Sequence, residues 1–248
     1  MKPIVWYTAE QPTLFPALYL MERMARVHHW VVLEEAQFDR DHVQFKVMAQ
    51  HGVLQLSVEL EGASRRRPFN ECGVLNPKRW ADQTAVTLQT CYGKQSPYRA
   101  LKPQIEALFD ALSVEPELVR ACDATLLWCA DLLGIDTTVW HSRQLTAERP
   151  EEPTAWMASF ADSLEATDYL QGADSMRSYF VKGPFEDRGM LTWGQDFRCR
   201  YTSLQGRGVE ASMSVLDALF VQGVEATRSL LRVDRGPGFI GTAVQLSR

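Results

Sequence analysis

Polar and acidic side chains follow two apolar runs near the start of the chain. Gln11 and Pro12 come after the first run, 3–7, and Glu34-Glu35 follow the second run, His29–Leu33. If the two runs are neighbouring strands of an open sheet, these side chains share the edge where α/β proteins bind ligands. A carboxylate at that edge can take a proton from an amine. The sequence therefore predicts acid-base chemistry at Glu34 and Glu35, and the alternative interpretation is a solvated pair of loop carboxylates.

Basic and acidic residues are unevenly distributed. Arg65 to Lys102 holds eight basic and two acidic residues, a local charge of +6, and Pro103 to Gly172 holds thirteen acidic and three basic residues, a local charge of −10. Two solvated faces of opposite sign would produce this pattern. The run Arg65-Arg66-Arg67 is also a candidate contact for a phosphate group in a nucleotide or in DNA. The net charge of −5 argues against a protein that coats nucleic acid unselectively.

Patterns for several other functions are absent from the sequence. The five histidines have no metal-ligand spacing, and there is no Walker loop and no Gly-x-Ser-x-Gly elbow. We therefore expect no metal ion and no cofactor. No apolar run reaches the roughly 18 residues that span a bilayer. The five cysteines form no Cys-x-x-Cys pair, which favours free thiols in a reducing compartment. We expect a cytoplasmic protein without a membrane partner.

The first sixty residues predict the order β-α-β-β-β. The strand at 3–7 is followed by a helix that Thr13 caps and that has Pro16 in its first turn. The apolar residues of this helix recur at helical spacing, which puts three charged residues on its other face: Glu22, Arg23 and Arg26. The remaining predicted strands are His29–Leu33, Val43–Met48 and Val53–Leu60, of which the last two form a hairpin.

Helices dominate the middle of the chain. Asn76-Pro77 begins a helix that reaches Tyr92, a second helix starts near Pro103, and a third starts near Pro116 and ends at Gly134. The later elements are strands at 137–140, 168–170 and 190–193 and helices at 155–164 and 214–220. The predicted fold is α/β, a mixed open sheet with helices packed on its faces and a helix-rich middle section.

The segment 144–154 has the composition of a linker or an exposed loop. It contains two prolines, and charged residues cluster in its second half. We expect it to separate an N-terminal part, 1–143, from a C-terminal part, 155–248, that packs on the same sheet.

Several motifs of the chain resemble the WbqC-like protein family. Gln11–Pro16 resembles its opening Gln-Pro-x-x-x-Pro, and Val31–Phe38 resembles its hydrophobic run into Asp-Asp-Val-Gln-Phe. The resemblance continues in Trp80 with 92–98, and in Leu133-Gly134-Ile135 with Ser142. It also includes the following C-terminal segments: 167–172 with Tyr179, Gln195-Asp196-Phe197 with Tyr201, and 214–217 with Phe220 and Gly223.

The chain departs from the family pattern at a few positions. Phe45-Lys46 stands where the family usually has Asn-Arg, which keeps the charge but loses the bidentate fork of arginine. Thr84 stands where a histidine is expected, so a family-wide histidine role is in doubt for this chain. Glu34 and Glu35 replace two aspartates, which keeps the charge and lengthens the reach.

The resemblance implies a transferase that decorates a base or a sugar. For the phage branch of the family, the implied reaction joins an amino acid, glycine above all, through its amine to pyrophosphorylated hydroxymethyl-uracil in DNA, and pyrophosphate leaves. For the polysaccharide branch, the acceptor is an amino or keto sugar on a nucleotide carrier. The partners are then modified DNA or a nucleotide-linked substrate, together with a free amino acid. A phage-encoded enzyme would act in the bacterial host cytoplasm.

The implied reaction needs a base, cations and a polar frame. The candidate bases are Glu34, Glu35 and Asp168, and Asp168 is equally well interpreted as a cap or turn residue. Lys46 and Lys94 are the candidate cations for the departing phosphate. The remaining candidates for substrate binding are Gln11, Pro12, Gln37, Tyr92, Tyr169, Gly172, Tyr179 and Gln195.

Two structural interpretations and one further function stay open at this stage. Tyr92 and Tyr179 are more often core residues than platforms for a base, and Asp217 is more often a charge in the first turn of a helix than a catalyst. A non-catalytic binding subunit is the further hypothesis. The local charge of +6 favours DNA as the acceptor, whereas the acidity of the whole chain favours a nucleotide sugar.

Overall fold

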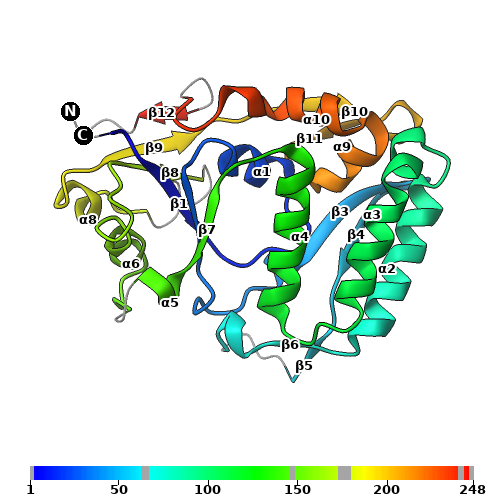
Figure 1. Cartoon of the computed structure of the whole chain (residues 1–248), viewed down its shortest axis with the longest axis horizontal. Helices are drawn as coiled ribbons and strands as arrows, with labels where there is room; N and C mark the ends of the chain where they lie inside the picture. Colours follow the sequence, from blue (N-terminus) through cyan, green and yellow to red (C-terminus); the bar gives the residue numbers. More distant parts are fainter. Residues whose placement is uncertain (1–2, 63–66, 146–148, 173–179, 240–242, 246–248) are drawn as a thin grey trace.

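A six-stranded sheet runs through the described part of the computed structural model, which comprises residues 3–62, 67–145, 149–172, 180–239 and 243–245 (Figure 1). The strand order is β12-β9-β8-β1-β2-β7. The five parallel strands are β1 (Trp6–Glu10), β2 (His29–Val32), β7 (Thr138–His141), β8 (Asp168–Gln171) and β9 (Leu191–Gln195). β12 (Ala243–Gln245) is antiparallel to β9. The predicted α/β class with a mixed open sheet is confirmed.

The order of the strands reverses direction at β1. From β1 the chain continues to β2 and β7 on one side, whereas β8 and β9 lie on the other side. In open α/β sheets a crevice forms at such a reversal, outside the carboxyl ends of the strands, and ligands bind there. The carboxyl ends of the two strands that flank the reversal are Glu10 in β1 and Gln171 in β8.

Helices cover both faces of this sheet. On one face, α1 (Leu18–Met24) contacts α10 (Val224–Leu231). On the other face lie α6 (Pro153–Ser159) and α8 (Gly183–Glu186), at the left of Figure 1, and they follow α5 (Ser142–Leu145) in the chain. The Tyr7 hydroxyl donates a hydrogen bond of 2.8 Å to the Met157 carbonyl, and the Tyr169 ring stacks on Phe185 with 4.4 Å between centroids. Aromatic side chains thus fix the second helical layer on the sheet.

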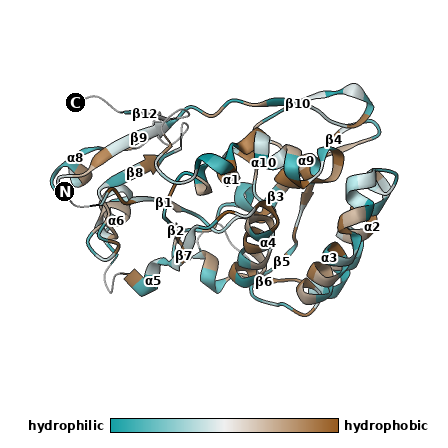
Figure 2. Cartoon of the chain, turned by 45° about the horizontal axis from the view of Figure 1, so that its top comes forward, coloured by the Kyte–Doolittle hydropathy of each residue, from teal (hydrophilic) through white to brown (hydrophobic). Residues whose placement is uncertain are grey.

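A second, mainly helical group stands beside the sheet (Figures 1 and 2). Its helices are α2 (Pro77–Tyr92), α3 (Ser96–Leu112), α4 (Leu118–Leu133) and α9 (Val215–Gln222), and α3 contacts the other three. Its hairpin is β3 (Gln44–Ala49) with β4 (Gly52–Ser57). Two short strand pairs complete the structure: β5 (Leu60–Glu61) with β6 (Gly73–Val74), and β10 (Arg200–Thr202) with β11 (Gly208–Glu210). Single 3-10 turns are η1 (Arg40–Val43), η2 (Phe69–Glu71), η3 (Leu204–Gly206) and η4 (Val233–Arg235).

Local signals in the sequence account for several helix ends. The Asn76 side chain accepts a hydrogen bond from the Arg79 backbone N–H, and α2 begins at the next residue, Pro77. Gly134 ends α4 with a φ of 59°, the left-handed conformation that glycine adopts most easily. Ser214 caps α9 by accepting a hydrogen bond from the Leu216 N–H.

Among the described residues, no helix is long and apolar enough to cross a membrane.

Two predicted helix starts are wrong. The first helix begins at Leu18 and not after Thr13, because the intervening segment uses its hydrogen bonds elsewhere. The Leu14 N–H donates to the His42 carbonyl at 3.0 Å, and Ala17 forms a bridge with Ser214. The helix predicted near Pro103 begins instead at Ser96, and Pro103 lies inside it. Its buried apolar stripe continues past this proline and keeps the helix in place.

The predicted solvent face of α1 is buried. Glu22, Arg23 and Arg26 have exposed fractions of 0%, 3% and 1%. Glu22 Oε1 accepts from Arg26 Nε at 2.7 Å, and the Arg26 guanidinium donates to the carbonyls of Leu231, Arg232 and Gly236. The segment that follows α10 therefore covers the side of α1 that amphipathic spacing assigned to solvent.

We expect the substitution Arg26→Met to lower the free energy of unfolding by about 3–5 kcal/mol, because it leaves the Glu22 carboxylate buried without its cation. Chemical denaturation measures this loss. Lys78→Met is the control, since Lys78 and Asp82 form an exposed i,i+4 pair, and its expected loss is below about 1 kcal/mol. Equal losses in the two variants would show that the buried pair does not hold α1.

Candidate functional site

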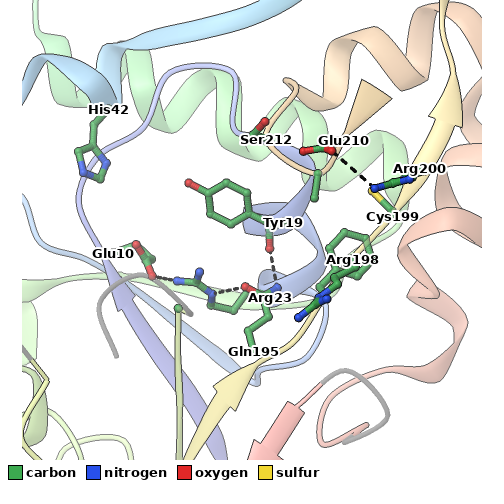
Figure 3. Close-up of a pocket in the computed structure, with 13 residues that line it drawn as sticks. Glu10, Tyr19, Arg23, His42, Gln195, Arg198, Cys199, Arg200, Glu210 and Ser212 are labelled. Carbon is green, nitrogen blue, oxygen red and sulfur yellow. Dashed lines mark hydrogen bonds and ion pairs between the residues drawn. The ribbon is translucent and has the colours of Figure 1, made fainter. Parts of the chain in front are cut away.

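A cavity of about 890 Å³ opens at the carboxyl ends of β1, β8 and β9 (Figure 3). It therefore lies at the reversal of strand order, where the topology places a ligand. Its size is in the range of small-molecule and cofactor sites. The charged and polar side chains of its wall are Glu10, Tyr19, Arg23, His42, Gln195, Arg198, Arg200, Glu210 and Ser212.

Arg23 and Gln195 form the floor of this cavity. The Arg23 guanidinium forms an ion pair with Glu10 and donates from Nε to Gln195 Oε1 at 3.0 Å. The amide nitrogen of Gln195 donates to the Tyr19 carbonyl at 2.8 Å and to Glu22 Oε2 at 2.6 Å. These contacts fix a guanidinium and an amide in one orientation before any ligand enters. Gln195, a predicted binding residue, thus lies in the cavity.

Gly172, another predicted binding residue, leaves room for Arg23. A Cβ atom at this position would lie 2.5 Å from a terminal nitrogen of Arg23 and 3.0 Å from its Cζ. Glycine therefore allows the guanidinium to pass close to the backbone after β8 and to reach Glu10.

The rim of the cavity carries two exposed arginines, Arg198 just before β10 and Arg200, the first residue of β10. Arg198 Nε lies 3.2 Å from Asp196 Oδ1, and a terminal nitrogen of Arg200 lies 4.0 Å from Glu210 Oε1. Both guanidinium groups can bind an anion, since these exposed pairs contribute little stability. Cys199 lies between them, and burial raises the pKa of its thiol to about 11, so it is not a thiolate nucleophile at neutral pH.

A second cavity of about 200 Å³ adjoins the first. The two share Tyr19, His42 and Ser212 in their walls, and Lys46 lines the smaller one. Burial lowers the pKa of His42, and the nearby carboxylates of Asp39 and Asp41 oppose this effect. The imidazole is therefore neutral at neutral pH and can accept a proton.

The predicted acidic pair lies at the carboxyl end of β2, at the same edge of the sheet. Glu34 has an exposed fraction of 2%, and its carboxylate lies 3.0 Å from Arg143 Nε and 3.4 Å from His141 Nδ1. Glu35 is half-buried, and its Oε2 accepts from the Ser142 hydroxyl at 3.1 Å. Glu34 and Glu35 are not among the residues that line either cavity.

His141 lies between two carboxylates. Its Nε2 is 3.2 Å from Asp123 Oδ2 in α4, opposite Glu34. The hydrogen bond to Asp123 raises the pKa of His141, and burial opposes the shift. Within the described residues, no group of three or more His, Cys, Asp or Glu side chains is arranged to hold a metal ion.

The other predicted residues at this edge are Gln11, Pro12 and Gln37. Gln11 follows β1, and its buried Oε1 has no hydrogen-bond partner among the described residues. Pro12 is buried and Gln37 is exposed. Gln37 bridges to Pro68, which places the backbone of Arg67 beside it.

The structure does not bring Asp168 to this edge. Asp168 begins β8 and so lies at the opposite, amino edge of the sheet. Its carboxylate accepts from Trp193 Nε1 and from the Thr167 hydroxyl, each at 2.7 Å, so Asp168 joins β8 to β9 at this edge. Tyr169 is fully buried, and its hydroxyl contacts the Met157 sulfur at 3.1 Å. Neither side chain lines the two cavities.

Three further candidates lie away from the two cavities or outside the described residues. The buried Tyr92 hydroxyl donates to Asp217, which also accepts from the Tyr201 hydroxyl at 2.5 Å. Tyr92 is thus a core residue, and Asp217, in the first turn of α9, anchors two tyrosines. Lys94 is exposed in the turn between α2 and α3. Tyr179 lies outside the described residues.

Sequence reasoning missed Glu10, Arg23, His42 and the rim arginines. Glu10 was predictable, since it ends the first strand at the edge where Gln11 was expected. Arg23 and His42 carry no comparable signal, because their roles arise from contacts with residues far away in the chain.

We expect Gly172→Ala to lower the free energy of unfolding by about 1–3 kcal/mol, since the added methyl group meets a guanidinium that is held at both ends. Thermal or chemical denaturation measures the loss. Gly183→Ala is the matched control, because a Cβ there has nothing within 4 Å. An unchanged free energy of unfolding in Gly172→Ala would mean that the Arg23 guanidinium does not lie beside Gly172.

We expect Asp123→Asn to lower the pKa of His141, measured by NMR titration, while Asp131→Asn, at an exposed position of α4, leaves it unchanged. Because folding raises this pKa, His141 contributes stability that is fully present below the ordinary value of about 6.5 and is lost as the pH rises through the raised value. A pKa that does not respond to Asp123→Asn would contradict the assignment of the hydrogen bond.

A comparison with models of protein families finds a match over most of the chain. The model of the WbqC-like protein family matches residues 11–229. The matched range begins directly after β1 and includes Arg23 and Gln195 of the floor, every residue that lines the two cavities except Glu10, and α9. A search of the curated proteins finds no match. Since the family model covers most of the chain, the protein is a member of the WbqC-like family.

Proposed function

We propose that this protein is a transferase that attaches an amino acid, glycine above all, through its amine to a phosphate-activated hydroxymethyl-pyrimidine in DNA. The observation that carries the proposal is the cavity of about 890 Å³ at the reversal of strand order, with arginines, a carboxylate and an amide in its wall. Family membership supports a biosynthetic enzyme in general terms.

The cations of the cavity suit a pyrophosphate leaving group. In the proposed step the amine nitrogen forms a bond to the methylene carbon, and the bond from that carbon to the pyrophosphate oxygen breaks. The electron pair of the broken bond leaves with pyrophosphate. Arg198 and Arg200 on the rim and Arg23 on the floor supply positive charge where the negative charge develops.

His42 suits the base of this reaction better than the acidic pair does. An amino acid enters as an ammonium ion and must give one proton to a base before its nitrogen can attack. His42 lies in the wall of both cavities and is neutral, whereas Glu34 is held by Arg143 and His141. Our proposal therefore assigns the proton to His42, and Glu34 and Glu35 support the neighbouring edge of the sheet.

DNA is the favoured acceptor because of the local charge of +6 between Arg65 and Lys102. Arg65 and Arg66 of the arginine run lie outside the described residues. Arg67 lies beside the carboxyl end of β2, where its carbonyl accepts from the Phe38 N–H at 2.7 Å. The nucleotide-linked sugar is the second candidate. It is favoured by the position of four other basic residues, at the far end of the molecule from β8 and β9 (Figure 1): Lys78 and Arg79 on α2, and Arg99 and Lys102 on α3.

The test uses purified protein, glycine and DNA that carries pyrophosphorylated hydroxymethyl-uracil, with nucleosides weighed by mass spectrometry after digestion. A glycine-sized addition together with pyrophosphate release is the expected result. A parallel reaction offers a pyrophosphate-linked nucleotide sugar. Addition to the sugar alone would establish the second candidate, and no addition to either acceptor would overturn the proposal.

Within this assay we expect His42→Gln to lower kcat by at least about 100-fold, the usual contribution of a general base. His51→Gln is the matched control, since His51 is exposed in the turn between β3 and β4. Glu34→Gln is expected to retain most of the activity. Loss of turnover in Glu34→Gln with normal turnover in His42→Gln would return the base to the acidic pair.

A further inference from the structure

The smaller cavity has polar groups of both charges. Lys46 and Asp41 are among the residues that line it, both are exposed, and neither forms an ion pair with another described residue. Thr13, Gln44 and Ser214 also line it, and the Ser214 hydroxyl is held by Phe15 and Leu216. A free amino acid at neutral pH carries one carboxylate and one ammonium group. The wall therefore offers one partner of opposite charge for each end of such a molecule.

The position of Lys46 follows from the strand that carries it. Side chains two residues apart in a strand point to the same face, so Gln44 and Lys46 share one face of β3, while Phe45 between them is buried. The Lys46 carbonyl accepts from the Ser214 N–H at 3.0 Å, which fixes the strand against the opposite wall.

The opposite wall is built from the segment between β1 and α1. Phe15 in this segment has a φ of 44°, a left-handed conformation that is costly for a large side chain. Two hydrogen bonds hold it there, since its N–H donates to Thr125 Oγ1 at 3.1 Å and its carbonyl accepts from the Ser214 hydroxyl at 3.0 Å. The backbone of this wall is therefore fixed before a ligand binds, which is the preorganisation that a binding site requires.

The smaller cavity meets the larger one at His42. With about 200 Å³ against about 890 Å³, the smaller cavity suits a molecule of a few heavy atoms, and the larger one suits the acceptor. A ligand whose carboxylate contacts Lys46 can direct its amino group past His42 toward the acceptor.

We propose that the smaller cavity is the binding site for the free amino acid, with Lys46 bound to its carboxylate. The proposal rests on the proposed function, since it assigns one of its two substrates to a place. The ligand of this site is a small α-amino acid in its zwitterionic form.

The test measures amino-acid binding without any acceptor. Glycine is titrated into the protein by calorimetry or followed by saturation-transfer NMR, with and without inorganic pyrophosphate to occupy the larger cavity. We expect Lys46→Met to weaken glycine binding at least tenfold and Lys46→Arg to restore most of it. Lys102→Met is the matched control, because Lys102 is exposed on α3. Glycinamide, which lacks the carboxylate, is expected to bind equally weakly to the wild-type protein and to Lys46→Met.

The outcomes separate this inference from the proposed function. Equal glycine binding by wild-type protein and Lys46→Met, or no glycine binding under either condition, would overturn the amino-acid site. Glycine binding that depends on Lys46, together with no transfer to DNA or to a nucleotide sugar, would support the site and overturn the proposed acceptors. Transfer with an unchanged KM for glycine in Lys46→Met would support the function and overturn the site.

Discussion

A chain of buried polar contacts joins the sheet, its covering helix and the cavity. It runs from Glu10 through Arg23 and Gln195 to Glu22 and Arg26, and it ends on the backbone carbonyls of Leu231, at the end of α10, and Arg232. Burying so many charges is costly unless each one is paired. Each member therefore depends on its neighbours in the chain of contacts. Because each buried charge needs its partner, the Arg23 and Gln195 side chains that form the cavity floor are held in place.

The fold was largely predictable because local signals agree with the sheet. Apolar runs correspond to β1 and β2, Asn76 begins α2, and Gly134 ends α4. The start of the first helix was not predictable from local signals. The segment before α1 takes its hydrogen-bond partners from residues such as His42 and Ser214, and no local pattern reports such contacts.

The sheet edge was predictable and the cavity was not. Gln11 and Glu34 follow parallel strands, so topology alone places them at one edge. The same rule places Asp168 at the opposite edge of the sheet, because this residue begins its strand. Burial determines the roles of Arg23 and His42. It makes Arg23, which amphipathic spacing assigned to solvent, part of the cavity floor, and it lowers the pKa of His42. Burial of this kind depends on which distant segments cover a residue.

The sequence separation across the polar contacts has a consequence for how the chain reaches its folded state. Arg23 contacts Gln195, 172 positions later, and Arg26 contacts the Leu231 carbonyl, 205 positions later. Such non-local contacts raise the contact order and slow folding. During synthesis on the ribosome, Arg23 and Arg26 can pair early with Glu10 and Glu22, whereas their contacts with Gln195 and the Leu231 carbonyl need nearly the whole chain. A nascent chain that stops before Gln195 therefore lacks the amide part of the cavity floor, and with it the rim arginines Arg198 and Arg200.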